Sequence, residues 1–479
     1  MDSLINNDTQ DLHWWLTLSE SKHLLSALFP DHELFQESVK LRPTTSFQPP
    51  VNMSRLLEDL QKVGVYGKHN TNKGSDKCWK QASSTNRDET GMAKVLNDTL
   101  TVVEKVTGEF KVKQSAIPLW FFQLTLIQTL RTWVVHGAVA PLKGLDANWK
   151  PDLALVPVDA AKKPLDWRDV SIVGEMKKWK TASTVKQSYT EVAGKTALLL
   201  YTQDGRHSAS SLRILGDYIV LTFFDRGGSL STVSIDINKY PEEFLHILIG
   251  ISWVPPSLIG FDETMLWDRD GRKHVVVALE DLGKEVVLDR LLFISDALHG
   301  CRTTVWAAKL MSTLDGSASI PRWIVVKDSW INPLWKFTKG SIIAKLNEAG
   351  VEGVPKLIHE QHIQASHPSH PGLRINQSTH IIQTILPHIQ THNYHIHVLS
   401  RLLTEPFGQQ IMVFSSLAKL LLTFIDCILS ELWLFLTYCH SQVLQYIRMW
   451  SRKHVSFIGI SACSISSSSS GMVWKQSAP

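Results

Sequence analysis

The pattern of hydrophobic and polar residues divides the chain near Leu119. Before that position, polar clusters at 68–76 and 83–89 separate short apolar segments such as 54–62. In that segment the apolar residues recur three and four positions apart, as on one face of an amphipathic helix. Residues 1–110 are therefore predicted to form helices joined by loops.

After Leu119 the pattern predicts helix and strand together. A helix-like run reaches Arg131, and strand-like runs follow it at 153–156, 170–176 and 218–224. Short β-branched and aromatic runs mixed with helical periodicity are typical of an α/β fold. We expect residues 111–267 to form an α/β domain with its own core.

The rest of the chain is predicted to hold a second domain and a tail. A charged segment with turn residues, 268–274, is expected to link the α/β domain to a domain at 285–436. Within that domain, residues 361–397 are rich in His, Ser, Pro and Gln and predict a long polar loop. The serine-rich end, 437–479, is expected to be disordered.

Composition narrows the class of protein. Apolar residues make up 44% of the 479 residues and charged residues 20%, as in folded globular proteins. The net charge is +4, with Lys and Arg scattered along the chain, so charge gives no support for nucleic-acid binding. The five cysteines lie far apart with no Cys-x-x-Cys pair, which disfavours a disulfide framework and suits an intracellular setting.

One segment, 411–438, is apolar enough to be considered for a membrane. Lys419, Asp426 and Glu431 interrupt it. Charges at that depth of a bilayer are costly, so a buried core helix is the better interpretation. The N-terminus also lacks the apolar core of a signal peptide. We expect neither secretion nor membrane insertion.

Two neighbouring segments, 294–309 and 323–330, carry the most informative chemistry. The first is predicted to be a hairpin with Gly300 at its tip, where a small residue lets backbone N–H groups approach phosphates. Val305 and Ala308 would line the pocket for an adenine. In the second segment, strand alternation points Lys327 to one face, where its ammonium can meet phosphates. An ordinary antiparallel pair is the alternative, because the tip lacks the full Gly-x-Gly-x-x-Gly pattern.

These segments resemble the fungal-type protein kinase family. Residues 300–306, 325–330 and 350–355 look like the hairpin, the lysine strand and a following turn of that family. Shorter segments are similar to other parts of its signature, at 150–155, 167–170, 174–177, 224–228, 236–237, 260–262, 405–408 and 414–416. The resemblance extends from about 110 to about 430.

The resemblance implies an α+β fold with a protein-kinase-like small lobe and a partial large lobe, preceded by the α/β domain. It implies ATP and Mg²⁺ as cofactors, and transfer of the γ-phosphoryl group to Ser or Thr hydroxyls of a protein substrate. The residues that would bind the nucleotide are Gly300, Val305, Ala308 and Lys327.

The chain also departs from the family. Where the family tends to place an acidic residue after the lysine strand, the chain has Lys339-Gly-Ser341, so the ion partner of Lys327 is not identified. Glu348 follows two turns later, and a structural surface role is the favoured interpretation for it. Neither a His-Arg-Asp nor an Asp-Phe-Gly run follows, so no catalytic residue is assigned. We therefore expect an inactive kinase-fold protein. A non-catalytic scaffold or pseudokinase that binds a protein partner is the alternative.

A second chemistry is suggested in the α/β domain. Asp152 follows a proline, and Glu175 and Lys177 share one face of the next strand. The Pro-Asp…Glu-x-Lys pattern is typical of metal-dependent nucleases, in which two carboxylates hold Mg²⁺ and the lysine polarises a water or phosphate. A strand that ends in an ion-paired Glu and Lys is the competing interpretation.

Histidines crowd the predicted polar loop, and three of them, His392, His395 and His397, have a spacing that could offer imidazoles to a metal. No cysteine or well-spaced carboxylate accompanies them. A solvated loop is therefore the favoured interpretation.

Overall fold

The structure is a computed structural model of the whole chain. It describes residues 13–29, 53–68, 77–79, 88–107, 131–135, 141–144, 149–162, 164–254, 256–267, 272–279, 282–295, 298–310, 322–351, 353–367, 370–380, 382, 396–408, 416–418, 421–422 and 425. One compact unit contains residues 1–345 and 355–408, and a second contains 346–354 and 409–479.

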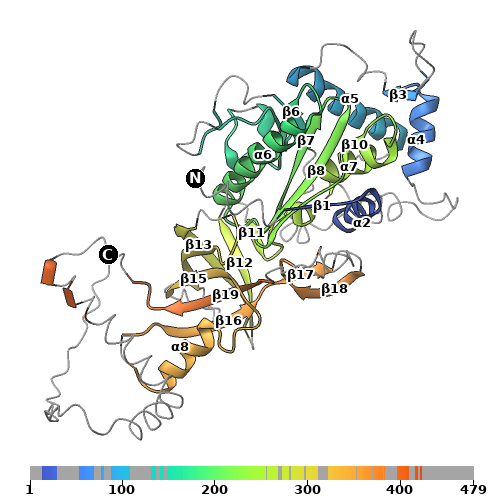
Figure 1. Cartoon of the computed structure of the whole chain (residues 1–479). Helices are drawn as coiled ribbons and strands as arrows, with labels where there is room; N and C mark the ends of the chain where they lie inside the picture. Colours follow the sequence, from blue (N-terminus) through green and yellow to red (C-terminus); the bar gives the residue numbers. More distant parts are fainter. Residues whose placement is uncertain are drawn as a thin grey trace, which may run out of the picture. The chain divides into compact units, whose positions relative to one another are not determined.

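The first unit contains two large sheets (Figure 1). The first sheet has the order β1-β9-β8-β7-β6-β5-β4, with β10 paired to β8. Its strands are β1 (His13–Trp15), β4 (Arg131–Val134), β5 (Leu153–Pro157), β6 (Ile172–Lys177), β7 (Ala209–Leu215), β8 (Tyr218–Asp225), β9 (Gly228–Ser231) and β10 (Ile235–Asp236).

Helices cover both faces of the first sheet. Leu153 and Leu155 of β5 pack in one core with α2 (Leu18–Leu28), α4 (Met53–Lys62), α5 (Glu89–Thr107) and α7 (Pro241–Trp253). Ala154 and Val156 alternate with those leucines and pack in another core, with α6 (Ala182–Thr202). Since alternate residues of a strand face opposite sides, the sheet is the middle of three layers. α6 connects the parallel strands β6 and β7, as a parallel pair requires.

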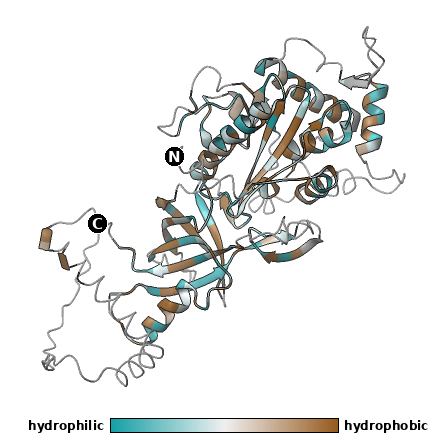
Figure 2. Cartoon of the chain, viewed as in Figure 1, coloured by the Kyte–Doolittle hydropathy of each residue, from teal (hydrophilic) through white to brown (hydrophobic). Residues whose placement is uncertain are grey.

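The second sheet is antiparallel throughout, in the order β11-β12-β13-β14-β15-β19-β16. Its strands are β11 (Met265–Trp267), β12 (Lys273–Leu279), β13 (Leu282–Ile294), β14 (Thr303–Leu310), β15 (Arg322–Ile331), β16 (Lys356–His362) and β19 (Val398–Glu405). α8 (Lys339–Glu348) comes between β15 and β16. The core of the second sheet includes Trp306, Ile324, Val326 and Leu403. Figure 2 shows hydrophobic residues on the strands of both sheets.

Shorter elements complete the described part of the chain. Two small hairpins pair β2 (Tyr66–Lys68) with β3 (Lys77–Trp79) and β17 (Gln364–His367) with β18 (His370–Asn376). Short 3-10 helices lie at Ala160–Lys162, Trp167–Asp169 and Pro256–Ile259.

The pattern of apolar residues predicted several of these elements. The helix expected at 54–62 is α4, and the strands expected at 153–156, 170–176 and 218–224 are β5, β6 and β8. Of the helix-like run from Leu119, only Arg131 lies among the described residues, and there it begins a strand. The tail 437–479 lies outside the described residues.

The long polar loop expected at 361–397 was wrong for much of its length. β16 extends to His362, and β17 and β18 form a hairpin within it. Its strands alternate polar residues with Ala365 and Ile375, a weak period-two signal that the His, Ser, Pro and Gln content hid.

The second sheet also begins earlier than expected. β11 and β12 pair with each other across residues 268–271, where the sequence predicted a linker, and both lie ahead of residue 285. Among the described residues, no helix is long and apolar enough to span a bilayer.

Candidate functional site

A row of four residues crosses the second sheet at Lys327. Lys327 of β15 lies opposite Val305 of β14 and opposite Leu402 of β19, and Leu402 lies opposite Glu360 of β16. Directly opposed residues in an antiparallel pair point to the same face. One step along, Ala307 and Val325 are opposed on that face too. We call Val305, Ala307, Val325 and Lys327 the lysine face.

The structure does not place Ala308 on the lysine face. Ala308 is opposed to Ile324, and both are fully buried in the core with Trp306 on the other side of the sheet. The sequence analysis grouped Ala308 with Val305 and Lys327, and this grouping needs correction. The residue separation from Val305 to Ala308 is odd, so strand alternation turns them to opposite faces.

Gly300 lies in the turn before β14, and its backbone is already bonded. Its φ is +86°, a conformation that favours glycine, and no atom lies within 4 Å of where a Cβ would be. Its N–H donates to the carbonyl of Arg226 at 2.9 Å, and Arg226 Nη1 donates to the carbonyl of Leu298 at 2.8 Å. The tip of this hairpin is therefore held by the turn between β8 and β9.

Lys327 faces another lysine instead of a carboxylate. It is half-buried, and Lys339, the first residue of α8, lies close enough to act on its protonation. Burial first, and then the Lys339 ammonium, lowers the pKa of Lys327 to about 8. Within the described residues, neither lysine makes an ion pair. Glu348 is the last residue of α8, at the other end of that helix from Lys339.

Glu360 is the acidic residue in the same row, and it binds the start of α8. The backbone N–H of Gly340 donates to Glu360 Oε1 at 3.2 Å, and the Thr338 hydroxyl donates to Oε2. These bonds satisfy a backbone donor that the first turn of a helix leaves unpaired. Glu360 thus stabilises the helix end and leaves Lys327 without a counter-charge.

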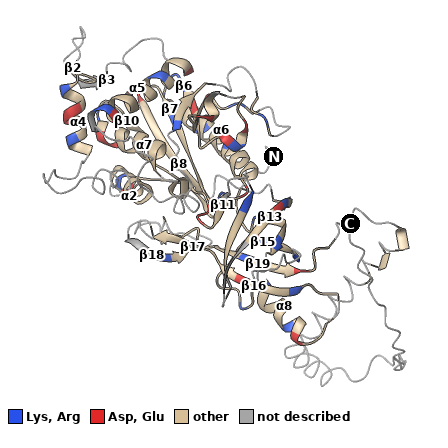
Figure 3. Cartoon of the chain, turned by 180° about the vertical axis from the view of Figure 1, so that it is seen from behind, with Lys and Arg blue, Asp and Glu red and all other residues tan. Residues whose placement is uncertain are grey.

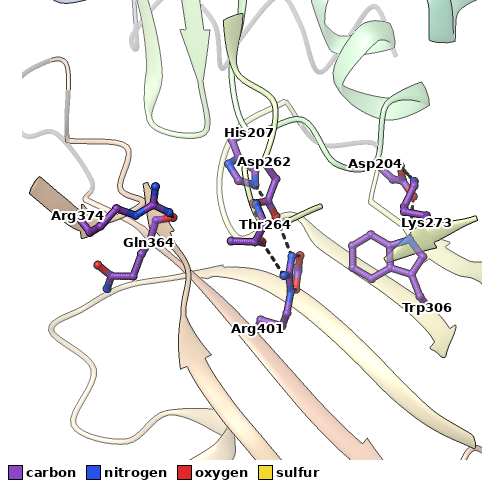
Figure 4. Close-up of polar contacts among 10 residues, drawn as sticks. Asp204, His207, Asp262, Thr264, Lys273, Trp306, Gln364, Arg374 and Arg401 are labelled. Atoms are coloured by element: carbon purple, nitrogen blue, oxygen red, sulfur yellow. Dashed lines mark hydrogen bonds and ion pairs between the residues drawn. The ribbon is translucent and has the colours of Figure 1, made fainter. Parts of the chain in front are cut away.

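On the face of β15 opposite Lys327, a buried arginine binds Asp328 and the segment just before β11 (Figure 4). Arg401 of β19 is fully buried. It donates to both carboxylate oxygens of Asp328 at 2.8 Å, to Asp262 at 2.9 Å and to the Thr264 hydroxyl at 2.9 Å. We call Asp262, Arg401 and Asp328 the buried triad.

The pKa values of the two carboxyls in the buried triad are shifted in opposite directions. Burial raises the pKa of Asp328 above its usual value, although Arg401 opposes the shift. Burial also acts to raise the pKa of Asp262, but Arg401 and His207 outweigh it and hold that pKa below its usual range. His207 Nε2 lies 3.6 Å from Asp262 Oδ2. Arg401 therefore favours the ionised form of both carboxyls, and together with His207 it keeps the pKa of Asp262 low.

Further contacts join the second sheet to the segment between α6 and β7. Trp306 Nε1 donates to Asp204 at 2.8 Å, and Asp204 also pairs with Lys273. Arg302 Nη1 donates to the carbonyl of Arg206 at 3.2 Å. We call these contacts, with the triad and the Gly300 turn, the joint.

The suggested nuclease site is an ion-pair cluster in the structure. Glu175 is buried, and its two oxygens pair with Lys177 at 2.8 Å and with Lys195. Lys177 also pairs with Glu191 at 2.7 Å. Asp152 accepts a hydrogen bond from the backbone N–H of Met176 at 2.8 Å. This is the arrangement that the sequence analysis gave as the competing interpretation.

Two further observations bear on metal and nucleic-acid binding. The described residues hold no group of three His, Cys, Asp or Glu placed to bind a metal ion, and His392 and His395 lie outside them. Lys and Arg are interspersed with Asp and Glu over the coloured elements in Figure 3, as the scattered charges in the sequence predicted.

Comparison with known families shows which family the chain belongs to. A family model described as fungal protein kinase matches residues 150–440, more than half of the chain. The chain belongs to the fungal protein kinase family. No curated protein matches it, and no solved structure does. The matched span of this fungal protein kinase family member includes most of the first sheet and all of the second.

The segments that carried the family resemblance meet at the joint. Arg226 comes from 224–228, Asp262 from 260–262, Arg302 and Trp306 from 300–306, and Asp328 from 325–330. Sequence reasoning missed Arg401, which lies in none of those segments. Its signal was weak, because a single arginine in an apolar strand marks a buried ion pair only when its partners are known.

We expect replacement of Arg401 by methionine to lower the free energy of unfolding by about 3–5 kcal/mol, because two buried carboxylates lose their cation. Urea denaturation of the full chain measures this. Arg374→Met is the matched control, because Arg374 is exposed and pairs with Glu263 at the surface. The control should cost less than about 1 kcal/mol. Equal losses in the two variants would show that the buried triad has no special weight.

Proposed function

We propose that this fungal protein kinase family member binds ATP on the lysine face. The observation that carries the proposal is the position of Lys327. It lies on the third of three successive antiparallel strands, β13, β14 and β15, and the helix α8 follows. In protein kinases the lysine that meets the phosphates is likewise on the third strand and ahead of a helix.

The lysine face suits the two ends of a nucleotide. Val305 and Val325 are half-buried and offer an apolar surface for the base, and the ammonium of Lys327 is adjacent to it for the phosphates. Ala307 lies on the same face but is fully buried, so no alanine takes the base-contacting role that was predicted for Ala308. Gly300 is given no phosphate contact, because its N–H bonds to Arg226.

Magnesium fits this face less well than the nucleotide does. Mg²⁺ is held by carboxylates together with substrate phosphates. The one acidic residue in the row of Lys327 is Glu360, and its two oxygens bind the start of α8. No step is therefore assigned to magnesium at the described residues.

We further propose that the chain retains ATP without transferring its phosphoryl group. Transfer needs an aspartate that orients the attacking hydroxyl and side chains that hold magnesium. The 479 residues contain no His-Arg-Asp or Asp-Phe-Gly run to supply them. Its role would then be to bind a protein partner in a nucleotide-dependent way, as a pseudokinase or scaffold does. The ion-paired Glu175 gives no reason to propose a nuclease instead.

Replacement of Lys327 by methionine should weaken ATP binding by about tenfold or more, because a charge-assisted hydrogen bond to phosphate is lost. Isothermal titration calorimetry of both proteins with ATP measures the change. The control is Lys309→Met, since Lys309 lies on the same face of the same sheet but pairs with Asp289 at 2.6 Å. Unchanged ATP affinity in Lys327→Met, or an equal loss of affinity in Lys309→Met, would show that Lys327 is not the lysine that binds the phosphates.

ATP affinity should also fall as the pH rises through about 8, because the pKa of Lys327 lies near that value and the neutral amine no longer attracts phosphate. The same titration at several pH values checks the sign. In Lys327→Met the decline across this window should be smaller. A decline of the same size in the variant would assign it to another group.

Incubation with γ-labelled ATP and a Ser/Thr-rich acceptor protein should give bound label without labelled acceptor. A family member that contains both catalytic runs is the positive control. Labelled acceptor in excess of a blank reaction would show that the chain supplies the catalytic groups by other residues and would overturn the non-transferring part of the proposal.

A further inference from the structure

The two lysines at the start of α8 and the middle of β15 form a pair of like charges. Lys327 is half-buried on the sheet, and Lys339 is exposed at the first position of α8, whose next residue, Gly340, is bonded to Glu360 in the row of Lys327. The Lys339 ammonium also acts on the pKa of Lys327. Two ammonium groups that are close together repel one another unless an anion lies between them. Within the described residues, no carboxylate supplies that anion.

The backbone at the start of α8 is held close to β16. Gly340 is buried, and a Cβ at that position would lie 2.8 Å from Glu360 Cβ. Only glycine therefore allows the first turn of α8 to approach β16 this closely. That approach, together with the hydrogen bonds that Gly340 and Thr338 donate to Glu360, places the first residue of α8, Lys339, on the side of the sheet that carries Lys327.

The local carboxylates cannot easily neutralise the pair. Glu360 lies on the same row of the sheet as Lys327, but Leu402 separates them and both Glu360 oxygens are bonded at the helix end. Moving Glu360 to the lysines would leave the N–H of Gly340 without its partner. A ligand anion can neutralise both lysines without that loss.

We propose that Lys339 and Lys327 together bind the polyphosphate of a nucleoside triphosphate, with Lys339 in place of the helix carboxylate that the kinase family uses. Lysines act on phosphate as point charges. Two lysines from different elements therefore suit a ligand with several phosphates better than a ligand with a single anionic group. This inference rests on the proposed function, because the apolar part of the lysine face would take the base.

The test uses the full chain and two probes, ATP and inorganic tripolyphosphate, with EDTA present so that no divalent cation bridges protein and phosphate. Replacement of Lys339 by alanine should lower the affinity for both probes by about tenfold or more. Replacement by glutamate should weaken them further, because the carboxylate would pair with Lys327 and repel phosphate. Lys336→Ala is the control, since Lys336 is exposed in the segment just before α8.

The outcomes separate this inference from the proposed function. If ATP binds and Lys339→Ala leaves both affinities unchanged, the two-lysine site is wrong and the ATP proposal stands. If tripolyphosphate binds through Lys339 but ATP binds no better than tripolyphosphate, the anion site is correct and the base pocket is not. Tighter ATP binding by Lys339→Glu would show that the family's lysine–carboxylate pair is what the site needs, and would overturn the inference. Equal unfolding midpoints of the variants exclude misfolding as a cause.

Discussion

The buried triad is the constraint on which the site depends. Arg401 lies with no exposed surface between Asp328 of the same sheet and Asp262 from the segment just before β11. Removing these charges from water is costly, so the arrangement survives only because every group finds a charged partner at hydrogen-bonding distance. Asp328 must therefore point into the joint. Since neighbours on a strand point to opposite faces, Lys327 must point away from it.

This relationship gives a physical reason for the adjacent lysine and aspartate in the strand motif. Lys327 lies on one face of the sheet and Asp328 on the other, so a single strand supplies both the lysine of the proposed nucleotide site and a carboxylate of the buried triad. Trp330 extends the second role, because its ring lies edge-on to His207 with centroids 5.9 Å apart. A motif that looks catalytic in the sequence is in large part structural.

The joint also affects how the Gly300 turn can act. In a protein kinase the covering loop approaches the phosphates through its backbone N–H groups. Here Arg226 is hydrogen-bonded to the turn at Leu298 and at Gly300. In the proposed complex, side chains therefore bind the phosphates. The Lys327 and Lys339 ammonium groups are the positive charges that the lysine face and the start of α8 provide.

Sequence reasoning predicted the elements with strong periodicity and the face of Lys327, because both follow from local alternation. It placed Ala308 on the wrong face by overlooking the same alternation, and it missed the β17–β18 hairpin because polar composition hid a weak period. It noticed Lys339 in place of an acidic residue, but the position of Glu360 depends on which strands pair. Arg401 depends on contacts between segments more than a hundred residues apart, which no local pattern encodes.

The most direct test of the account is to treat the full chain with an acyl phosphate of ATP, which acylates lysines beside the bound phosphates, and to map the modified residues by mass spectrometry. The account predicts acylation of Lys327 and Lys339 that excess ATP suppresses. Acylation spread over exposed lysines and insensitive to ATP, or suppressed by ATP only at lysines away from β15 and α8, would contradict it.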